Sequence, residues 1–92
     1  MNSLEKSNKI KEILESKKAV DISLLRVQEK TVLADYFVVA TGTSSTHVKS
    51  LAEEIDARLS EFDISPIGHE GKLSNNWVLL DYGDVIVHIF SH

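Results

Sequence analysis

The chain has 92 residues, 42% hydrophobic and 26% charged, a composition that excludes wholesale disorder and leaves room for one small domain. It contains no cysteine, which excludes disulfides, thiolate catalysis and cysteine-ligated zinc. The formal net charge of −4 disfavours binding to a nucleic-acid backbone, because that affinity comes largely from lysine and arginine.

The first half of the chain predicts one helix and two strands. Residues 4–17 carry apolar side chains on one helical stripe, with Ser3 as a candidate cap. Residues 19–28 begin with the alternation of a half-buried strand. Residues 36–41 are a continuous apolar run, which predicts a central strand covered on both faces and ended by Gly42.

The second half predicts a long helix and a β-hairpin. Residues 43–46 offer several N-caps. Apolar residues then keep helical spacing over four turns: Val48, Leu51, Ala52, Ile55, Leu59 and Phe62. Residues 67–71 contain a short strand, and the runs 77–82 and 85–90 form a hairpin whose turn holds Gly83.

The resulting order, α-β-β-α-β-β-β, predicts an α/β (α+β) fold in which a mixed β-sheet packs against helices. We expect one domain over residues 1–92, with residues 1–18 as its N-terminal helix. The sequence does not fix the order of the strands in the sheet.

Charge and polarity indicate the kind of partner and location. Residues 1–18 hold five lysines against three glutamates (+2), and residues 19–92 hold five basic against eleven acidic residues (−6). The acidic part suits a basic protein partner. No apolar run approaches the roughly 20 residues of a membrane span, and the polar N-terminus is not typical of a signal or transit peptide. A cytoplasmic location without membrane contact is therefore expected.

The candidates for chemistry are weak. Thr41–Ser45 joins a strand to a helix, where anions often bind, but it lacks the rest of a P-loop. Asp81 and Asp84 bracket the hairpin turn, and Asp35 stands elsewhere. Metal-dependent phosphoryl transfer needs convergent carboxylates, whereas aspartates spaced across a bend are typical turn formers. We therefore expect no metal, no cofactor and no catalytic residue.

The histidines and two aromatic residues leave more than one interpretation open. His47, His69, His88 and His92 form no metal-binding or nucleophile motif. Trp77 and Tyr82 stand at opposite parity along one strand, so their rings point to opposite faces of the sheet. One ring is then expected in the core and the other partly exposed, where it could serve as a binding hot spot.

Three separated segments carry a resemblance to a known family. They are Asp35–Ser44 with His47 (DYFVVATGTS followed by His), Pro66–Gly71 (PIGHEG) and Trp77–His88 (WVLLDYGDVIVH). In this order they resemble the ribosomal silencing factors, or Iojap family, over most of the chain. The family usually continues into an aromatic-containing C-terminal tail, whereas this chain stops at His92. We therefore expect a short natural form or a fragment that lacks the tail.

The resemblance implies a fold similar to nucleotidyltransferases without their active-site acids. It implies binding to a large-subunit ribosomal protein, number fourteen, on the intersubunit face, which blocks subunit joining and represses translation. It also implies a homodimer when no ribosome is present. The acidic charge balance, for its part, leads us to expect no direct nucleic-acid readout. The implied contacts are Trp77, Leu79, Asp81, Tyr82, Gly83 and Asp84, with Asp35, Thr41, Ser44 and His47 as secondary candidates.

Two alternatives remain at this point. One is a residual nucleotidyl- or phosphoryl-transfer enzyme that combines Thr41–Ser45 with Asp81 or Asp84. The other is a homodimeric interaction module with a different partner.

Overall fold

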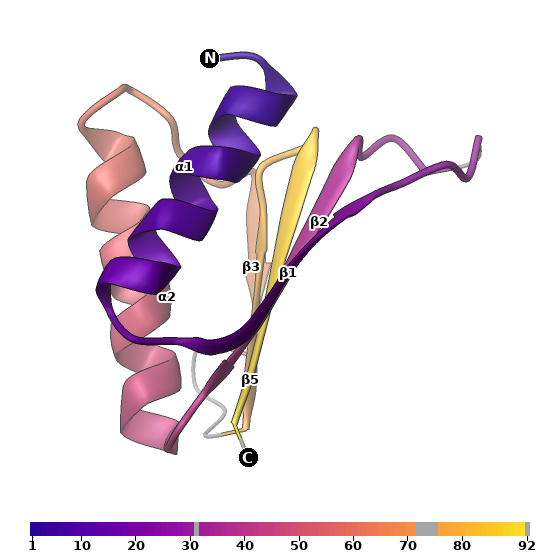
Figure 1. Ribbon diagram of the computed structural model, residues 1–92. Helices are drawn as coiled ribbons and strands as arrows, with labels where there is room; N and C mark the ends of the chain where they lie inside the picture. The colour runs from indigo at the N-terminus through magenta and orange to yellow at the C-terminus, as the bar shows by residue number, and fades with distance from the viewer. Residues whose placement is uncertain (31, 72–75, 92) are drawn as a thin grey trace.

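Two helices pack on one side of a five-stranded sheet in the computed structural model, which describes residues 1–30, 32–71 and 76–91 (Figure 1). The predicted element order is confirmed. The elements are α1 (Ser3–Ser16), β1 (Val20–Arg26), β2 (Tyr36–Gly42), α2 (Ser45–Ser60), β3 (Gly68–Glu70), β4 (Trp77–Asp81) and β5 (Val85–Ser91).

The sheet is mixed, as predicted, and its strand order is β1-β2-β5-β4-β3. β2 and β5 are parallel neighbours in the middle, and the other three pairings are antiparallel. The hairpin of β4 and β5 therefore adds to β2 through its second strand. This arrangement brings strands from the middle and last thirds of the chain together in the centre of the sheet.

Helix α1 begins at a reciprocal cap, one residue before the predicted one. The cap is Asn2, not Ser3: the Asn2 side chain accepts from the backbone N–H of Glu5, and the Glu5 carboxylate accepts from the backbone N–H of Asn2. This capping box satisfies two N–H groups that the first turn leaves free. At the other end Lys18 takes a φ of 64°, and the N–H of Ala19 donates to the carbonyl of Leu14.

Helix α2 begins at Ser44, one of the predicted caps, whose hydroxyl accepts from the backbone N–H of His47. Its start lies against the end of β2, since a Cβ on Gly42 would stand 2.8 Å from a methyl carbon of Val48. A larger residue at position 42 would push the helix off the strand. The close approach aligns the apolar stripe of α2 with the core.

The core lies between the helices and one face of the sheet. Its largest fully buried side chains come from both helices and from β2, β4 and β5: Ile10, Ile13, Leu14, Leu51, Ile55, Leu59, Leu80, Ile89, Val38, Val48, Val78 and Val85. Burial of such side chains contributes roughly 1.5–3 kcal/mol each before conformational entropy is subtracted.

β2 is central in the sheet, but the prediction that both of its faces are covered is wrong. Val38 and Ala40 are fully buried under the helices, whereas Phe37, Val39 and Thr41 point to the other side and are only half-buried. No element of the described residues covers that other side (Figure 1). Apolar residues on both sides of a strand predict two buried faces, and here the second face is open.

Candidate functional site: the open face of the sheet

The uncovered side of the sheet is predominantly apolar, and we call it the open face. The strand registers place twelve side chains on it: Ser23 and Leu25 from β1; Phe37, Val39 and Thr41 from β2; Ile86, His88 and Phe90 from β5; Trp77, Leu79 and Asp81 from β4; and Glu70 from β3. They are half-buried or exposed, since strand neighbours cover only their flanks. Contiguous apolar surface of this kind marks an interaction site more often than a bare monomer surface.

Aromatic rings form a row across the open face. The ring of His88 meets Phe37 edge-on at 5.2 Å and lies parallel to Phe90 at 6.4 Å, measured between ring centroids. Trp77 stands directly opposite Phe90 in the β4–β5 ladder. Trp77 keeps 37% and Phe90 44% of its surface exposed. Large rings held by strands and still accessible are the side chains that dominate binding energies at protein interfaces.

His88 is the one titratable group in this row. Its register neighbours are Val39 and Leu79, so apolar side chains surround it on both adjacent strands. Partial burial lowers the pKa of His88 below its usual value of 6.5, because the cation loses hydration there. The imidazole is therefore neutral at neutral pH, and the row carries no charge.

One margin of the open face is acidic. Glu70 of β3 faces the same side as Leu79, and Asp81 lies next along β4. Both carboxylates line a hollow of about 340 Å³ together with Leu79 and Ile86. A basic side chain could place its ammonium or guanidinium group between the two acids and its methylene stem on the apolar wall.

The hairpin turn next to this margin is held by its own acids. A carboxylate oxygen of Asp81 accepts from the N–H of Gly83 at 2.8 Å, and Gly83 takes a φ of 85°. The carboxylate of Asp84 pairs with the ammonium of Lys6 at 2.8 Å. The described residues contain no group of three His, Cys, Asp or Glu able to hold a metal ion. These contacts give Asp81 and Asp84 roles in the turn.

Tyr82 lies in the core and not on the open face. Its side chain is 5% exposed and packs in the core under the helices, whereas Trp77, at the other end of β4, stands on the open face. Burial raises the pKa of the Tyr82 phenol well above its usual range, and the nearby Asp56 carboxylate adds to the shift. The expectation that Tyr82 contacts a partner stays a prediction, and its burial gives the ring a packing role in the core beside the turn.

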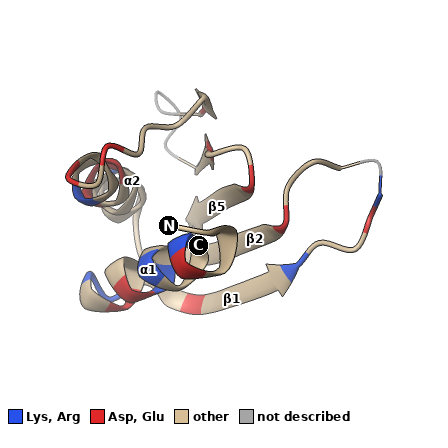
Figure 2. Cartoon of the chain, turned by 90° about the horizontal axis from the view of Figure 1, so that it is seen from above, with Lys and Arg blue, Asp and Glu red and all other residues tan. Residues whose placement is uncertain are grey.

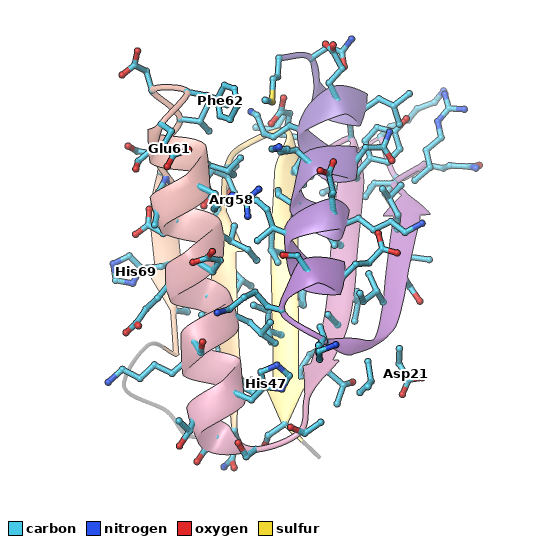
Figure 3. The ribbon with its side chains drawn as sticks, turned by 60° about the vertical axis from the view of Figure 1, so that its left-hand side comes forward. Asp21, His47, Arg58, Glu61, Phe62 and His69 are labelled. Carbon is cyan, nitrogen blue, oxygen red and sulfur yellow. The ribbon has the colours of Figure 1, made fainter. Side chains whose placement is uncertain are left out.

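The four secondary candidates do not form one site. Thr41 lies on the open face opposite Phe90. Ser44 is the cap of α2, and the backbone N–H of Asp35 donates to the carbonyl of Asp84 at 2.7 Å. His47 lies between the ends of the two helices (Figure 3).

His47 joins the end of α1 to the start of α2. Its Nδ1 accepts from the N–H of Thr43 at 2.9 Å, so the proton belongs on Nε2, which donates to the carbonyl of Lys17 at 2.8 Å. The ring thus makes a hydrogen bond from each nitrogen. This is a structural contact, and nothing about it requires a ligand.

Five apolar residues of the open face were not singled out from the sequence: Leu25, Phe37, Val39, Ile86 and Phe90. Leu25, Phe37 and Phe90 come from three different strands, and only the register brings them beside Trp77 and His88. The available signal was the apolar character of residues on both sides of β2 and β5. That signal was present, but it was attributed to the interior of the protein.

Comparisons with known proteins agree with this architecture. The family described as "Ribosomal silencing factor during starvation" matches the chain over residues 1–92. The protein named ribosomal silencing factor RsfS in Chromobacterium violaceum is 42% identical over 78 residues, covering 85% of this chain and 64% of the relative. The protein of that name in Bacillus subtilis is 38% identical over 76 residues, covering 83% of this chain and 64% of the relative.

Solved structures show the same likeness. A crystal structure of a Chromobacterium violaceum protein superposes with a TM-score of 0.92 at 40% identity, covering 99% of this chain and 76% of that one. A Bacillus halodurans structure gives a TM-score of 0.80 at 31% identity, covering 96% and 79%. No helix among the described residues is long and apolar enough to cross a membrane. The chain therefore spans about three fifths of the length of these two curated relatives, 64% in each case.

Proposed function

Because the chain belongs to the family of ribosomal silencing factors, we propose that it binds the large ribosomal subunit, blocks its union with the small subunit and so represses translation. It acts by occupying space and not by catalysis. The observation that carries this proposal is the open face, an apolar and aromatic surface that the protein's own helices leave uncovered.

Chemistry of the open face favours a protein partner with a basic rim. Trp77 and Phe90 supply exposed aromatic area, and Glu70 and Asp81 supply negative charge at the margin. A partner with an apolar patch beside lysine or arginine would complement both parts. The resemblance names such a partner: ribosomal protein fourteen of the large subunit, which we propose binds here.

The arrangement of layers suits a steric block. A partner on the open face leaves α1 and α2 on the far side of the sheet (Figure 1). The bound chain would then stand as a two-layer obstacle on the intersubunit face. The proposal includes cytoplasmic action and, in the absence of ribosomes, pairing of two copies through the same apolar face.

Sedimentation tests this function directly. The purified chain is run in density gradients with isolated large subunits, small subunits and intact ribosomes. We expect migration with the large subunit alone, and a lower yield of joined ribosomes when the chain is added before the subunits are mixed. Equal migration with both subunits, or joining that proceeds unchanged although the chain is bound, would contradict the proposal. A full-length relative run in parallel shows whether the part of the relatives that this chain does not span affects binding.

A further inference from the structure

A second surface lies at the corner where α1 ends and α2 begins, and every residue that lines it has a polar or basic side chain. We call it the basic corner: a cavity of about 570 Å³ lined by Ser16, Lys17, Lys18, Thr43, His47 and Ser50. Figure 3 shows His47 at this corner, between the helix ends. Because no carboxylate lines the cavity, it differs from the acidic margin of the open face.

The basic corner offers mostly hydrogen-bond donors. Lys17 and Lys18 are exposed, and neither ammonium group has an acid within ion-pair distance among the described residues. Thr43 and Ser50 line the same cavity, and the Thr43 hydroxyl lies 3.1 Å from Nδ1 of His47, which leaves Ser50 as the hydroxyl donor. Two cations and a hydroxyl without a competing acid are suited to the oxygens of a phosphodiester, which only accept hydrogen bonds.

The positive charge of the basic corner contrasts with the rest of the chain, which is acidic. Residues 19–92 hold five basic against eleven acidic residues, a balance of −6, whereas residues 1–18 carry +2. Lys6 pairs with Asp84, and the ammonium of Lys9 lies over the ring of Phe62 and 3.9 Å from Glu12, so both already have partners. Lys17 and Lys18 are exposed and line the basic corner, and Figure 2 shows basic (blue) chain where α1 leads into β1.

Lys18 occupies a backbone position that suits glycine better. Its φ of 64° lies in the left-handed region, at the helix end where glycine is usual. A lysine there gives up some stability to place an ammonium group beside Lys17. Replacing Lys18 by glycine therefore removes the ammonium group without adding backbone strain.

The basic corner adjoins the open face. Thr43 follows Gly42 directly, and Thr41, two residues earlier, stands opposite Phe90 on the open face. A large partner that covers the Trp77–Phe90 end of the open face would therefore reach the corner around the end of β2.

We propose that the basic corner contacts the phosphate backbone of ribosomal RNA when the open face is docked on its protein partner. This inference rests on the proposed function and adds a second partner to it. The contact is to phosphates and carries no base readout. It differs from the expectation drawn from net charge, because the acidic margin of the open face and the basic corner lie on different surfaces.

The test compares two variants of equal net charge. In the first, Lys17→Gln and Lys18→Gly remove the corner's ammonium groups, and glycine suits the backbone at position 18. In the second, Lys30→Gln and Lys49→Gln remove two exposed lysines that do not line the corner. Affinity for isolated large subunits is measured at several salt concentrations, with circular dichroism and thermal melting to confirm folding.

We expect the corner variant to melt at or above the wild-type temperature and yet to depend less on salt. Loss of two phosphate contacts should make the fall in affinity between 50 and 200 mM salt roughly tenfold smaller. The control variant should keep the wild-type salt dependence. An unchanged dependence in the corner variant, or an equal change in both variants, overturns the RNA contact while the proposed function stands.

Two further outcomes are informative. If the wild-type chain does not bind large subunits at all, the proposed function fails and takes this inference with it. If inorganic phosphate raises the melting temperature of the wild type but not of the corner variant, and subunit binding is the same in both, the corner holds a small anion instead. That result would overturn the RNA contact.

Discussion

The ammonium of Lys6 lies 2.8 Å from a carboxylate oxygen of Asp84, which ties the first turn of α1 to the turn between β4 and β5. The two residues stand 78 positions apart. The lysine side chain is 11% exposed and the aspartate 34%, so water screens the pair only in part. It fixes the hairpin, and with it the acidic margin of the open face, to the helix layer.

Lys6→Met should therefore destabilise the protein by about 1–2 kcal/mol, because the Asp84 carboxylate stays half-buried without its cation. Urea denaturation followed by circular dichroism measures the loss. The exposed Lys9–Glu12 pair, at 3.9 Å, provides the control: Glu12→Gln should change stability by less than about 0.5 kcal/mol. A double-mutant cycle with Asp84→Asn that gives no coupling would contradict the assigned pair.

His47→Ala should cost about 1–2 kcal/mol, since it removes the hydrogen bonds to the Thr43 N–H and the Lys17 carbonyl. The loss should appear as faster hydrogen exchange at the end of α1 and the start of α2. Thr46→Ala, at an exposed neighbouring position, is the control and should leave both regions protected. Unaltered protection in the His47 variant would show that the ring does not hold the two helix ends together.

Tyr82→Phe should leave stability unchanged or raise it by about 1 kcal/mol, because the buried Tyr82 hydroxyl finds no hydrogen-bond partner among the described residues. Tyr82→Ala should cost about 3–5 kcal/mol through the cavity it leaves. Thermal unfolding of both variants checks this. Strong destabilisation by Tyr82→Phe would mean that the hydroxyl is bonded.

The raised pKa of Tyr82 also predicts that the protein loses stability at alkaline pH. The pKa of Tyr82 is higher in the folded state than in the unfolded state. The stability that its neutral phenol contributes is therefore fully present below about pH 10 and is lost as the pH rises further. Alkaline titration monitored by circular dichroism should give unfolding at higher pH for Tyr82→Phe than for the wild type. Coincident transitions would exclude Tyr82 as their cause.

His88 predicts the opposite dependence on pH, with stability lost on acidification. Burial lowers its pKa in the folded state, so the unfolded chain binds the proton more readily, and stability falls as the pH drops below the unfolded value of about 6.5. His88→Phe should show a smaller loss of stability than the wild type between about pH 7 and 5. His69→Phe, at an exposed position, controls for other histidines. Parallel pH profiles for wild type and His88→Phe would contradict the prediction.

Trp77→Ala should weaken binding to the large subunit by about 2 kcal/mol or more while the domain stays folded. Phe62→Ala is the matched control, since Phe62 is an exposed aromatic residue just after α2, remote from the open face (Figure 3). Affinity and melting temperature are measured for both variants. Equal losses of affinity would show that the open face is not the docking surface.

The sequence predicted the elements well because their signals are local. The stripe from Val48 to Leu59 could only be a helix, and the turn at Gly83 made a hairpin of the last two runs. The cap was missed by one residue because Asn2 and Ser3 are both good caps, and only the reciprocal contact with Glu5 decides between them.

The candidate site was harder to predict because it depends on strand order. The parity of Trp77 and Tyr82 indicated opposite faces, but which face the helices cover is a tertiary property. Phe37 has the sequence pattern of a core residue, because side chains at an interface and side chains in the core are both apolar. The pairing of Lys6 with Asp84 could not be read from positions so far apart in the chain.

A sheet with helices on one side only gives neighbouring positions of the same strand different tasks. Val38 and Val87 hold the fold together, whereas Val39 and His88, one step along each strand, face outward. Substitutions at the outward positions can alter what the protein recognises with little effect on whether it folds. The central strands therefore offer a ready scaffold for re-engineering specificity, in which new surfaces can be selected one alternate residue at a time.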